Sequence, residues 1–449
     1  MSTDLPTEHS TPVEFQEIII NSKSFPTKID VKEVVTNIEI YEHLEKAYLT
    51  AVMSVVDADD IISGSNISGG ETVIIKIKST RPKTRSVSKK FYIDKMTTSQ
   101  KTSSNVEFYV FHLVEDIAFL SSLKNVNKSY SGTPQAIIEN IFKEIKSDDE
   151  DTLEKTIESS SQTDQNSMKV IVPNMSPLDA MSWIKDRACT SKGYPFYLMS
   201  TLVDDNLVFV DLETMLKKGS LNPEVPFIYG GDIAGGNDLP IGTSSRRVIL
   251  GYKSSNTENL LSLIKKGLIG AEYQFINPTS NKKNTTVDFN VEEVTKKLSE
   301  DLKVDEETSP YPKDYTFSKQ KSRIIARAGT TNPYKKGIKS YREVDNEDEG
   351  QYKKDIMRES FDSLLKKNPL TILVNGVDFL DGDTHTTIGK LIDIRFTRNL
   401  APQRDNYYYD NKKSGAFLIY SAKHSFTPED YVISFSCVKV DNKGVKDGK

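Results

Sequence analysis

The sequence predicts a mainly β, α+β fold in which two similar antiparallel β-barrels flank an inserted α/β domain. Three observations support this prediction. Short apolar-rich runs with period-two alternation fill residues 13–120, and runs of the same texture return in 369–441. Residues 121–218 mix helical and strand patterns instead. The length of 449 residues also suits several domains better than one core.

The first barrel is predicted from alternating runs that are separated by Gly, Ser, Asn, Pro or Asp. In the run TVIIKIKS, one face carries Val73, Ile75 and Ile77, and the opposite face carries Lys76 and Lys78. One face of this strand is therefore expected to pack and the other to meet water. The six runs are EFQEIII, TNIEIYEHL, YLTAVMSVV, ETVIIKIKS, KKFYIDKMTTS and NVEFYVFHLVE.

The middle of the chain predicts two amphipathic helices and a hairpin. Thr133 as N-cap and Pro134 at the first helical position begin one helix. Ser176 begins the other as a capping-box variant, and Gly193 is expected to stop it. Residues 146–167 are acidic, rich in serine and poor in apolar side chains, so they predict a mobile insertion. YPFYLMS and NLVFVDL predict the hairpin.

These patterns together predict the domain organisation. It comprises a flexible N-terminus (1–12), a first β-barrel domain (13–120), an α/β domain (121–218) with a mobile acidic loop (146–167), the start of a second β-barrel (219–275), a helical and mixed insertion (276–368), the remainder of the second barrel (369–441) and a flexible C-terminus (442–449).

Composition argues against several classes of protein. The 59 basic and 64 acidic residues give a net charge of -5, which offers no electrostatic footprint for a nucleic acid or an anionic membrane. The two cysteines, Cys189 and Cys437, form neither a disulfide framework nor a metal knuckle. Residues 1–12 lack the apolar core of a signal peptide, and no apolar run reaches the length of a membrane span. We expect a soluble chain in a reducing compartment, without membrane insertion.

The acidic residues Asp57, Asp59 and Asp60 raise the question of a metal site. An EF-type calcium loop needs Gly at its sixth position and Glu at its twelfth. Counted from Asp57, these positions hold Ile62 and Ser68. We therefore favour a turn after AVMSVV in which Asp59 and Asp60 supply local bonds from side chain to backbone.

No motif for catalysis or for a cofactor stands out. The five histidines are isolated from one another, and His112 and His424 lie in predicted strands, where a structural role is favoured over ligation. The chain also lacks a GxSxG elbow, a P-loop and a GxGxxG site. Asp204 and Asp205 lie at the tip of a predicted hairpin, which indicates a solvated turn. We predict no catalytic, cofactor-binding or metal-binding residues, no cofactor and no enzymatic activity.

Two segments are candidate partner contacts. RPKTRSVSKK carries the densest positive charge and includes Arg81, Lys83 and Arg85. It is either a charged loop that protects a strand edge or a surface that meets a partner protein or passing DNA. The loop with Tyr407, Tyr408 and Tyr409 is either an interface anchor or an ordinary exposed loop.

Several stretches follow one another in a definite order along the chain: LTAVMSVVDADDIISGSNISGGETVIIKIKS, FHLVEDIAFLSS, YSGTPQAIIENIF, SPLDAMSWIKDRACTSKGYPFYLM, NLVFVDLETML, LTILVNGVDFLDGDTHTTIGKLIDIRF and FLIYSAKHSFTPEDYVISFSCV. The fourth stretch contains a helix motif formed by Pro177, Ala180, Trp183 and Ile184. This motif and the serial order of the stretches resemble those of the central baseplate hub proteins of contractile-tailed phages, a family related to the hub half of type VI secretion spike proteins.

The resemblance implies a homotrimer in which the two barrels of each chain form a pseudo-hexameric ring. Such a ring joins a sixfold tail tube to a threefold spike and forms part of a delivery channel, with Lys76 and Lys78 as candidate lumen-facing residues. The implied partners are the tail spike, the tail tube, other baseplate proteins and DNA that passes transiently without specific binding. The implied location is the virion tail baseplate, assembled in the host cytoplasm. The spike is expected to be a separate chain, because no spike segment follows Lys449.

Two other classes of function remain as alternatives. A tail-associated cell-wall hydrolase would show turnover on peptidoglycan. A receptor- or glycan-binding tail module is supported only by the tyrosines of the 400–414 loop.

Overall fold

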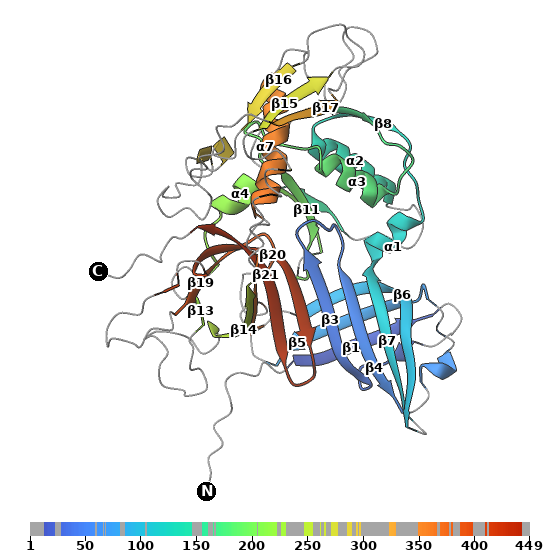
Figure 1. Ribbon diagram of the computed structural model, residues 1–449. Coiled ribbons are helices and arrows are strands. Elements are labelled where there is room, and N and C mark those ends of the chain that lie inside the picture. The colour runs from blue at the N-terminus through green and yellow to red at the C-terminus, as the bar shows by residue number, and fades with distance from the viewer. Residues whose placement is uncertain are drawn as a thin grey trace, which may run out of the picture.

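The structure is a computed structural model (Figure 1). It describes residues 13–22, 28–58, 61–65, 67, 69–80, 86–103, 106–145, 155–159, 165, 168–203, 205–221, 226–229, 247–254, 261, 265, 271–276, 285–289, 293–294, 296–297, 323–328, 349–365, 369–376, 379, 387–397, 409–410 and 413–441.

One large sheet dominates the described part of the chain. Its strands follow the order β14-β18-β21-β20-β3-β4-β7-β6-β5-β1-β2, and β13 pairs with β19, which pairs with β20. Their bounds are β1 Val13–Asn21, β2 Ile29–Asp30, β3 Val35–His43, β4 Thr50–Asp57, β5 Thr72–Ser79, β6 Ser86–Ser103, β7 Val106–Glu115, β13 Phe227–Tyr229, β14 Ile249–Ser254, β18 Pro369–Asn375, β19 Leu391–Phe396, β20 Gly415–Phe426 and β21 Tyr431–Asp441.

This topology corrects the prediction of two separate barrels. β20 pairs antiparallel with β3, so strands from the two ends of the chain belong to one continuous sheet. Within the described ranges, no ladder closes either end into a barrel. The alternation within a strand does not show which other strand pairs with each of its edges, because that pairing is decided by tertiary contacts.

The two ends nevertheless repeat one pairing pattern. The first half contains β5-β6-β7-β4-β3, and the second half contains β19-β20-β21-β18-β14, in the same order along the chain and with every neighbouring pair antiparallel. The strand next to this group of five differs between the two halves, because β1 runs antiparallel to β5 whereas β13 runs parallel to β19. The likeness of the two ends thus lies in five strands of each.

Irregularities in the ladders repeat as well. The register shift between Val35 and Asn37 in β3 has its counterpart between Ile249 and Gly251 in β14. The ladder of β6 with β7 shifts at Ile93, and that of β20 with β21 shifts at the corresponding Ile419. Because bulges redirect side chains, these matches fix which residues of the two halves are equivalent.

The strands form one hydrophobic core because their side chains alternate. In β5, Val73, Ile75 and Ile77 are buried, whereas Lys76 is half-buried and Lys78 exposed on the opposite face. This alternation is the one predicted from TVIIKIKS. β6 pairs with β5 through its first half and with β7 through most of its length, so the sheet folds over itself at this long strand.

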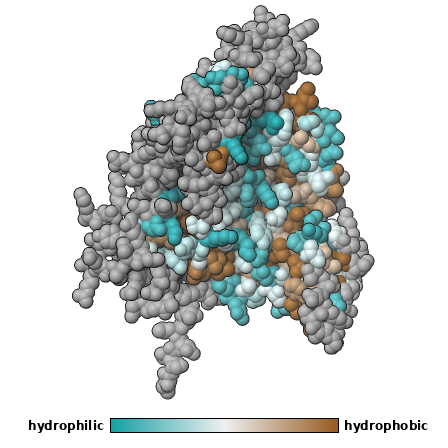
Figure 2. All heavy atoms as spheres, viewed as in Figure 1, coloured by the Kyte–Doolittle hydropathy of each residue, from teal (hydrophilic) through white to brown (hydrophobic). Residues whose placement is uncertain are grey.

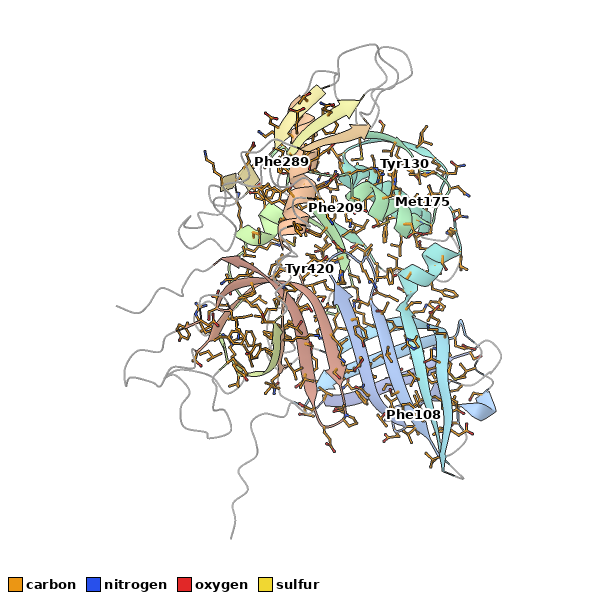
Figure 3. The ribbon with its side chains drawn as sticks, in the orientation of Figure 1. Phe108, Tyr130, Met175, Phe209, Phe289 and Tyr420 are labelled. Atoms are coloured by element: carbon orange, nitrogen blue, oxygen red, sulfur yellow. The ribbon has the colours of Figure 1, made fainter. Side chains whose placement is uncertain are left out.

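A separate α/β layer covers the upper end of the sheet in the view of Figure 1. Its core is a second hydrophobic cluster, in which the rings of Phe196 and Phe209 stack at 4.8 Å (Figure 3). Its elements are α1 Asp116–Ser122, β8 Ser129–Gly132, α2 Pro134–Ile145, β9 Ile157–Ser159, β10 Met168–Ile171, α3 Pro177–Lys185, β11 Phe196–Ser200, β12 Leu207–Asp211 and α4 Leu212–Lys217; a short 3-10 turn, η1, spans Ser63–Ser65 of the first half.

The predicted helix starts of this layer are confirmed. Thr133 Oγ1 accepts a hydrogen bond from the Ala136 amide at 3.3 Å, and Ser176 Oγ accepts one from the Asp179 amide at 3.2 Å. The end of the second helix differs, because α3 stops at Lys185 instead of continuing to Gly193. Gly193 instead adopts φ +87 in the following turn, where a Cβ would lie 3.2 Å from that of Met357.

The third part comprises a small sheet and one long helix. The strands β15 Ala271–Ile276, β16 Thr285–Phe289 and β17 Arg323–Ala328 form this sheet, and α7 spans Glu349–Leu365. Phe275 stacks on Tyr352 of α7 at 3.8 Å, and Phe361 of α7 stacks on Tyr194 at 4.4 Å. α7 therefore connects the small sheet to the α/β layer. No helix of the described ranges is long and apolar enough to cross a membrane.

Candidate functional site

The face of the sheet opposite the core is polar along β3, β20 and β21. Half-buried side chains there include Glu39 and Tyr41 of β3 and Lys423 and Ser425 of β20. Lys423 Nζ lies 2.6 Å from Glu39 Oε1, and Ser425 Oγ donates to Asn37 Oδ1 at 3.4 Å. Figure 2 shows the surface of this view as a mixture of hydrophilic and hydrophobic residues, without one continuous apolar area. This face of the sheet is therefore polar and in contact with water.

The ladder of Ile38–His43 with Ser421–Phe426, which we call the β3·β20 seam, joins the two halves. Side chains pack across its upper end, where the ring of Tyr420 meets that of His43 edge-on at 4.9 Å (Figure 3). A pocket of about 240 Å³ also opens on the seam. Because small-molecule sites usually enclose about 300–1,000 Å³, we interpret this pocket as surface relief.

Three neighbouring strands each carry a buried carboxylate at their last or next-to-last residue. Each carboxylate lies on the same face of its strand as the buried apolar side chains. Glu42 follows Ile38 and Ile40 in β3, and Glu115 continues the inward face of β7. Asp57 does the same in β4. Their exposed fractions are only 2%, 1% and 3% for Glu42, Glu115 and Asp57. Each must therefore find partners inside the protein.

Glu42 joins three parts of the chain. Its Oε2 lies 2.9 Å from His424 Nε2 of β20 and accepts a hydrogen bond from the Thr387 hydroxyl. Its Oε1 accepts one from the Leu202 amide of the α/β layer. His424 Nδ1 in turn lies 2.8 Å from the hydroxyl oxygen of the buried Tyr431. This Glu42 cluster fixes the second half and the α/β layer against the first half.

The electrostatics of the Glu42 cluster favour a charged carboxylate. Burial by itself raises the pKa of Glu42, but the charge and hydrogen bond of His424 and the donors Thr387 and Leu202 together hold this pKa below its ordinary value. Burial and the nearby Glu42 charge raise the pKa of Tyr431 far above its ordinary value. Glu42 is therefore ionised and Tyr431 neutral at pH 7.

Glu115 forms a second buried junction with the α/β layer. Its Oε2 accepts hydrogen bonds at 2.9 Å from both the Leu49 amide and the Ser200 hydroxyl. The buried Lys155 Nζ lies 2.5 Å from Glu115 Oε1 and donates to Ser200 Oγ at 3.1 Å. This junction and the Glu42 cluster both hold the segment 200–202.

Asp57 holds the turn after β4, a role that the sequence predicted for Asp59 and Asp60. Its two carboxylate oxygens accept hydrogen bonds from the Ile61 amide at 3.1 Å and the Ile62 amide at 2.8 Å. Asp59 and Asp60 lie outside the described residues. Within the described ranges, no group of three or more His, Cys, Asp or Glu side chains is arranged to hold a metal ion.

We expect Asp57→Ala to lower the free energy of unfolding by about 1–3 kcal/mol, because two amides lose their buried acceptor. Asp57→Asn keeps one acceptor oxygen and should cost less. Chemical denaturation of both variants, with and without Ca²⁺, measures these losses in the free energy of unfolding. A large stabilisation of the unmodified protein by Ca²⁺ that Asp57→Ala abolishes would contradict the turn role.

The predicted contact residues are not brought together in one described site. Lys76 forms an ion pair with Glu17 of β1, and Lys78 is opposite Glu14 in the same ladder. Tyr409 is half-buried, bridges to Thr397 and has its ring 6.0 Å from the Arg395 guanidinium. The remaining candidates, Arg81, Lys83, Arg85, Tyr407 and Tyr408, lie outside the described residues.

The structural role predicted for the strand histidines is confirmed. His424 is fully buried and has polar partners at both ring nitrogens, and His112 Nε2 lies 3.0 Å from Thr97 Oγ1. Asp205 is exposed over 71% of its side chain, as a hairpin tip predicts, and also pairs with the buried Lys89 of β6 at 2.7 Å. Asp204 lies outside the described residues.

Comparison with known proteins supports the fold. No family model matches the sequence, and no curated protein matches it. A tail protein from Neisseria meningitidis MC58 has a TM-score of 0.53 at 11% identity and covers 96% of this chain and 97% of its own. The 43 kDa tail protein of prophage MuSo2 from Shewanella oneidensis has a TM-score of 0.50 at 11% identity, with coverages of 95% and 99%. A component of the Escherichia coli type VI secretion system gives 0.41 at 10% identity, with coverages of 95% and 77%.

The chain therefore has the fold of phage tail proteins over almost its whole length. The resemblance to tail hub proteins that the sequence indicates is confirmed at the level of the fold. At 11% identity, this likeness concerns the fold alone and does not assign individual contact residues.

Proposed function

We propose that this protein is the structural central hub of a contractile phage tail baseplate or of a related injection machine. In this role, three copies form a ring that joins a sixfold tail tube to a threefold spike. The ring is part of the channel through which DNA or an effector passes. Its place is the virion tail, after assembly in the host cytoplasm.

The observation that carries this proposal is the repeat of five strands in the two halves of the chain. A chain with two similar halves offers six similar units per trimer, and it can therefore match sixfold symmetry on one side and threefold symmetry on the other. The likeness of the fold to two phage tail proteins supports the same function.

The polar face supports a channel wall as well. Lys423 and Glu39 balance one another in charge, and the serines of β20 and β21 on this face are uncharged. A wall without excess positive charge would let a polyanion pass without holding it. Lys76 and Lys78 of β5 remain candidates for the lumen, and the 81–85 and 407–409 segments remain candidates for partner contacts.

We expect the purified protein to have the mass of three chains in solution, either alone or on addition of its spike protein. Light scattering after size-exclusion chromatography, or native mass spectrometry, measures this. Permanent assemblies commonly bury about 2,000 Å² or more, so the complex should survive dilution to micromolar concentration. A mass of one chain in both conditions would refute the proposal, and so would turnover of peptidoglycan.

A further inference from the structure

One buried cation of the second half has few partners. Arg395 lies in β19 and is only 8% exposed. Among the described residues, its one hydrogen-bond acceptor is the backbone oxygen of the neighbouring Ile394, at 3.0 Å from Nη1. A guanidinium carries five N–H donors, and a buried charge is normally paired with an opposite charge. Arg395 thus buries a positive charge that no ion pair joins to an acid of the described part of the chain.

The surroundings of Arg395 do not replace the missing carboxylate. Burial lowers the pKa of its guanidinium, whereas the nearby Asp393 and Tyr409 raise it, and an arginine stays charged at pH 7. The ring centroid of Tyr409 is 6.0 Å away, at the outer limit of a cation–π contact. Arg187, by comparison, stacks on Trp183 at 4.0 Å. Arg395 therefore lies near an aromatic ring without being stacked on it.

The repeat of the two halves identifies the counterpart of Arg395. Val73 of β5 and Ile392 of β19 are both opposite a phenylalanine that lies two residues before the shared bulge of β6 and β20. Lys76 and Arg395 each follow three residues later, so they are equivalent. A cation thus stands at the same place in both halves.

The strands beside these two cations differ, and one of them supplies an acid. β1 runs antiparallel to β5 and places Glu17 opposite Lys76, with which it forms an ion pair. β13 runs parallel to β19 and places the buried Ile228 opposite Arg395 (Figure 1). The first half therefore supplies the carboxylate that its cation needs, whereas the second half has an apolar side chain at that place.

We propose that Arg395 binds a single carboxylate side chain of a partner protein, beside the ring of Tyr409. The planar guanidinium matches the two oxygens of a carboxylate, and such a pair is strong where water is excluded. That this partner belongs to the same machine rests on the proposed function, whereas the binding of a carboxylate does not. In the proposed ring, the site occurs at three of six equivalent places, because Glu17 occupies the other three. It would thus suit a partner of threefold symmetry.

The charges around Arg395 favour a carboxylate over the phosphates of a nucleic acid. A polyanion is held by several cations, because each neutralised phosphate adds to the affinity. Asp393 lies two residues before Arg395 on the same face of β19 and would repel the neighbouring phosphates. A single carboxylate side chain can meet one guanidinium without bringing further negative charges close to Asp393.

Replacing Arg395 with methionine distinguishes a binding role from a structural one. Arg395→Met removes a buried charge that lacks an ion pair and keeps most of the side-chain length, so the protein should melt at the same or a higher temperature. Lys76→Met is the matched control, because it breaks the ion pair with Glu17 and should not raise the melting temperature. A marked fall for Arg395→Met would overturn the proposal, since the guanidinium would then already have its partners within the chain.

Ile228→Glu tests whether the guanidinium accepts a carboxylate, because it copies the arrangement of Glu17 and Lys76 into the second half. The fall in melting temperature caused by Ile228→Glu should be much smaller in the presence of Arg395 than in the Arg395→Met background, where the new carboxylate is buried without a cation. An equal fall in both backgrounds would show that Arg395 does not take up a carboxylate at this place.

A peptide probe measures binding from outside to the full-length protein. The probe is acetyl-Gly-Glu-Gly-amide, and acetyl-Gly-Gln-Gly-amide at equal ionic strength is its control. A ligand that binds only the folded state raises the melting temperature. The glutamate peptide should therefore raise it for the unmodified protein and for Lys76→Met, and should leave Arg395→Met and Ile228→Glu unchanged. Inorganic phosphate and a short single-stranded oligonucleotide are tested in parallel.

The outcomes separate this site from the proposed function. Equal effects of the two peptides, or an effect of the glutamate peptide that persists in Arg395→Met, would overturn the site. An effect of phosphate or of the oligonucleotide without one of the glutamate peptide would overturn the carboxylate as its ligand. Each of these results together with a three-chain mass would leave the hub intact. A single-chain mass would overturn the hub and leave the carboxylate site in place.

Discussion

Replacing His424 with leucine is expected to lower the free energy of unfolding by about 3–5 kcal/mol, because it leaves the buried, ionised carboxylate of Glu42 without its imidazole partner. His424 and Glu42 are both almost fully buried, so water cannot replace the lost contact. The Tyr431 hydroxyl loses its partner as well. Chemical denaturation followed by circular dichroism and by the fluorescence of Trp183 measures the change.

The matched control for His424→Leu is Glu39→Gln, which removes the ion pair of Glu39 with Lys423 in the same seam. Lys423 and Glu39 are 40% and 21% exposed, and exposed pairs contribute about 0–1 kcal/mol. A similar small loss in both variants would show that the buried cluster does not hold the two halves together. Because Trp183 lies in α3, its fluorescence also reports whether the α/β layer separates from the sheet.

Gly376→Ala is expected to destabilise the protein by about 3 kcal/mol through overpacking. A Cβ at Gly376 would lie 2.2 Å from Cδ1 of Tyr431, which is far inside van der Waals contact. Tyr431 is fully buried, stacks on Phe426 at 4.3 Å and is held at its hydroxyl by His424. The ring of Tyr431 therefore cannot move away from Gly376 without losing these contacts.

Gly64→Ala is the control for this variant, because a Cβ at Gly64 meets no atom within 4 Å. Its effect should stay within about 0.5 kcal/mol, as for other surface substitutions. Differential scanning fluorimetry of the two variants side by side measures the contrast. Equal melting temperatures would mean that the core around Tyr431 is loosely packed.

The local structure of this protein is readable from its sequence because the alternation and capping signals are strong. The six runs of the first half correspond to β1, β3, β4, β5, β6 and β7. Thr133 and Ser176 cap the helices that they were expected to begin. These signals act over a few residues, so they do not depend on the rest of the fold.

The buried carboxylates were missed although a signal for them exists. Glu42 continues the inward phase of Ile38 and Ile40, and Glu115 continues that of Phe111 and Leu113. A charged residue in phase with a buried face must be paired or pay a large desolvation cost. Alternation could therefore have marked both positions. Their partners could not be found in this way, because His424 is 382 residues away from Glu42 along the chain.

Local sequence patterns also do not predict that the two ends of the chain join into one sheet. The pattern of β3 and β20 fixes their inward faces, but it contains no information on which strand lies beside each edge. The seam depends on long-range contacts through Glu42, Thr387 and Leu202. The five-strand repeat likewise becomes visible only when the ladders and their bulges are known.

The hydrogen bonds of the β3·β20 seam have a mechanical consequence. Antiparallel ladders carry bonds that run perpendicular to the strands. A pulling force along the strands must shear all rungs from Ser421 to Phe426 together, whereas a force across them opens one rung at a time. The seam would thus resist a pulling force far better along the strands than across them, and single-molecule pulling along the two axes would reveal that anisotropy.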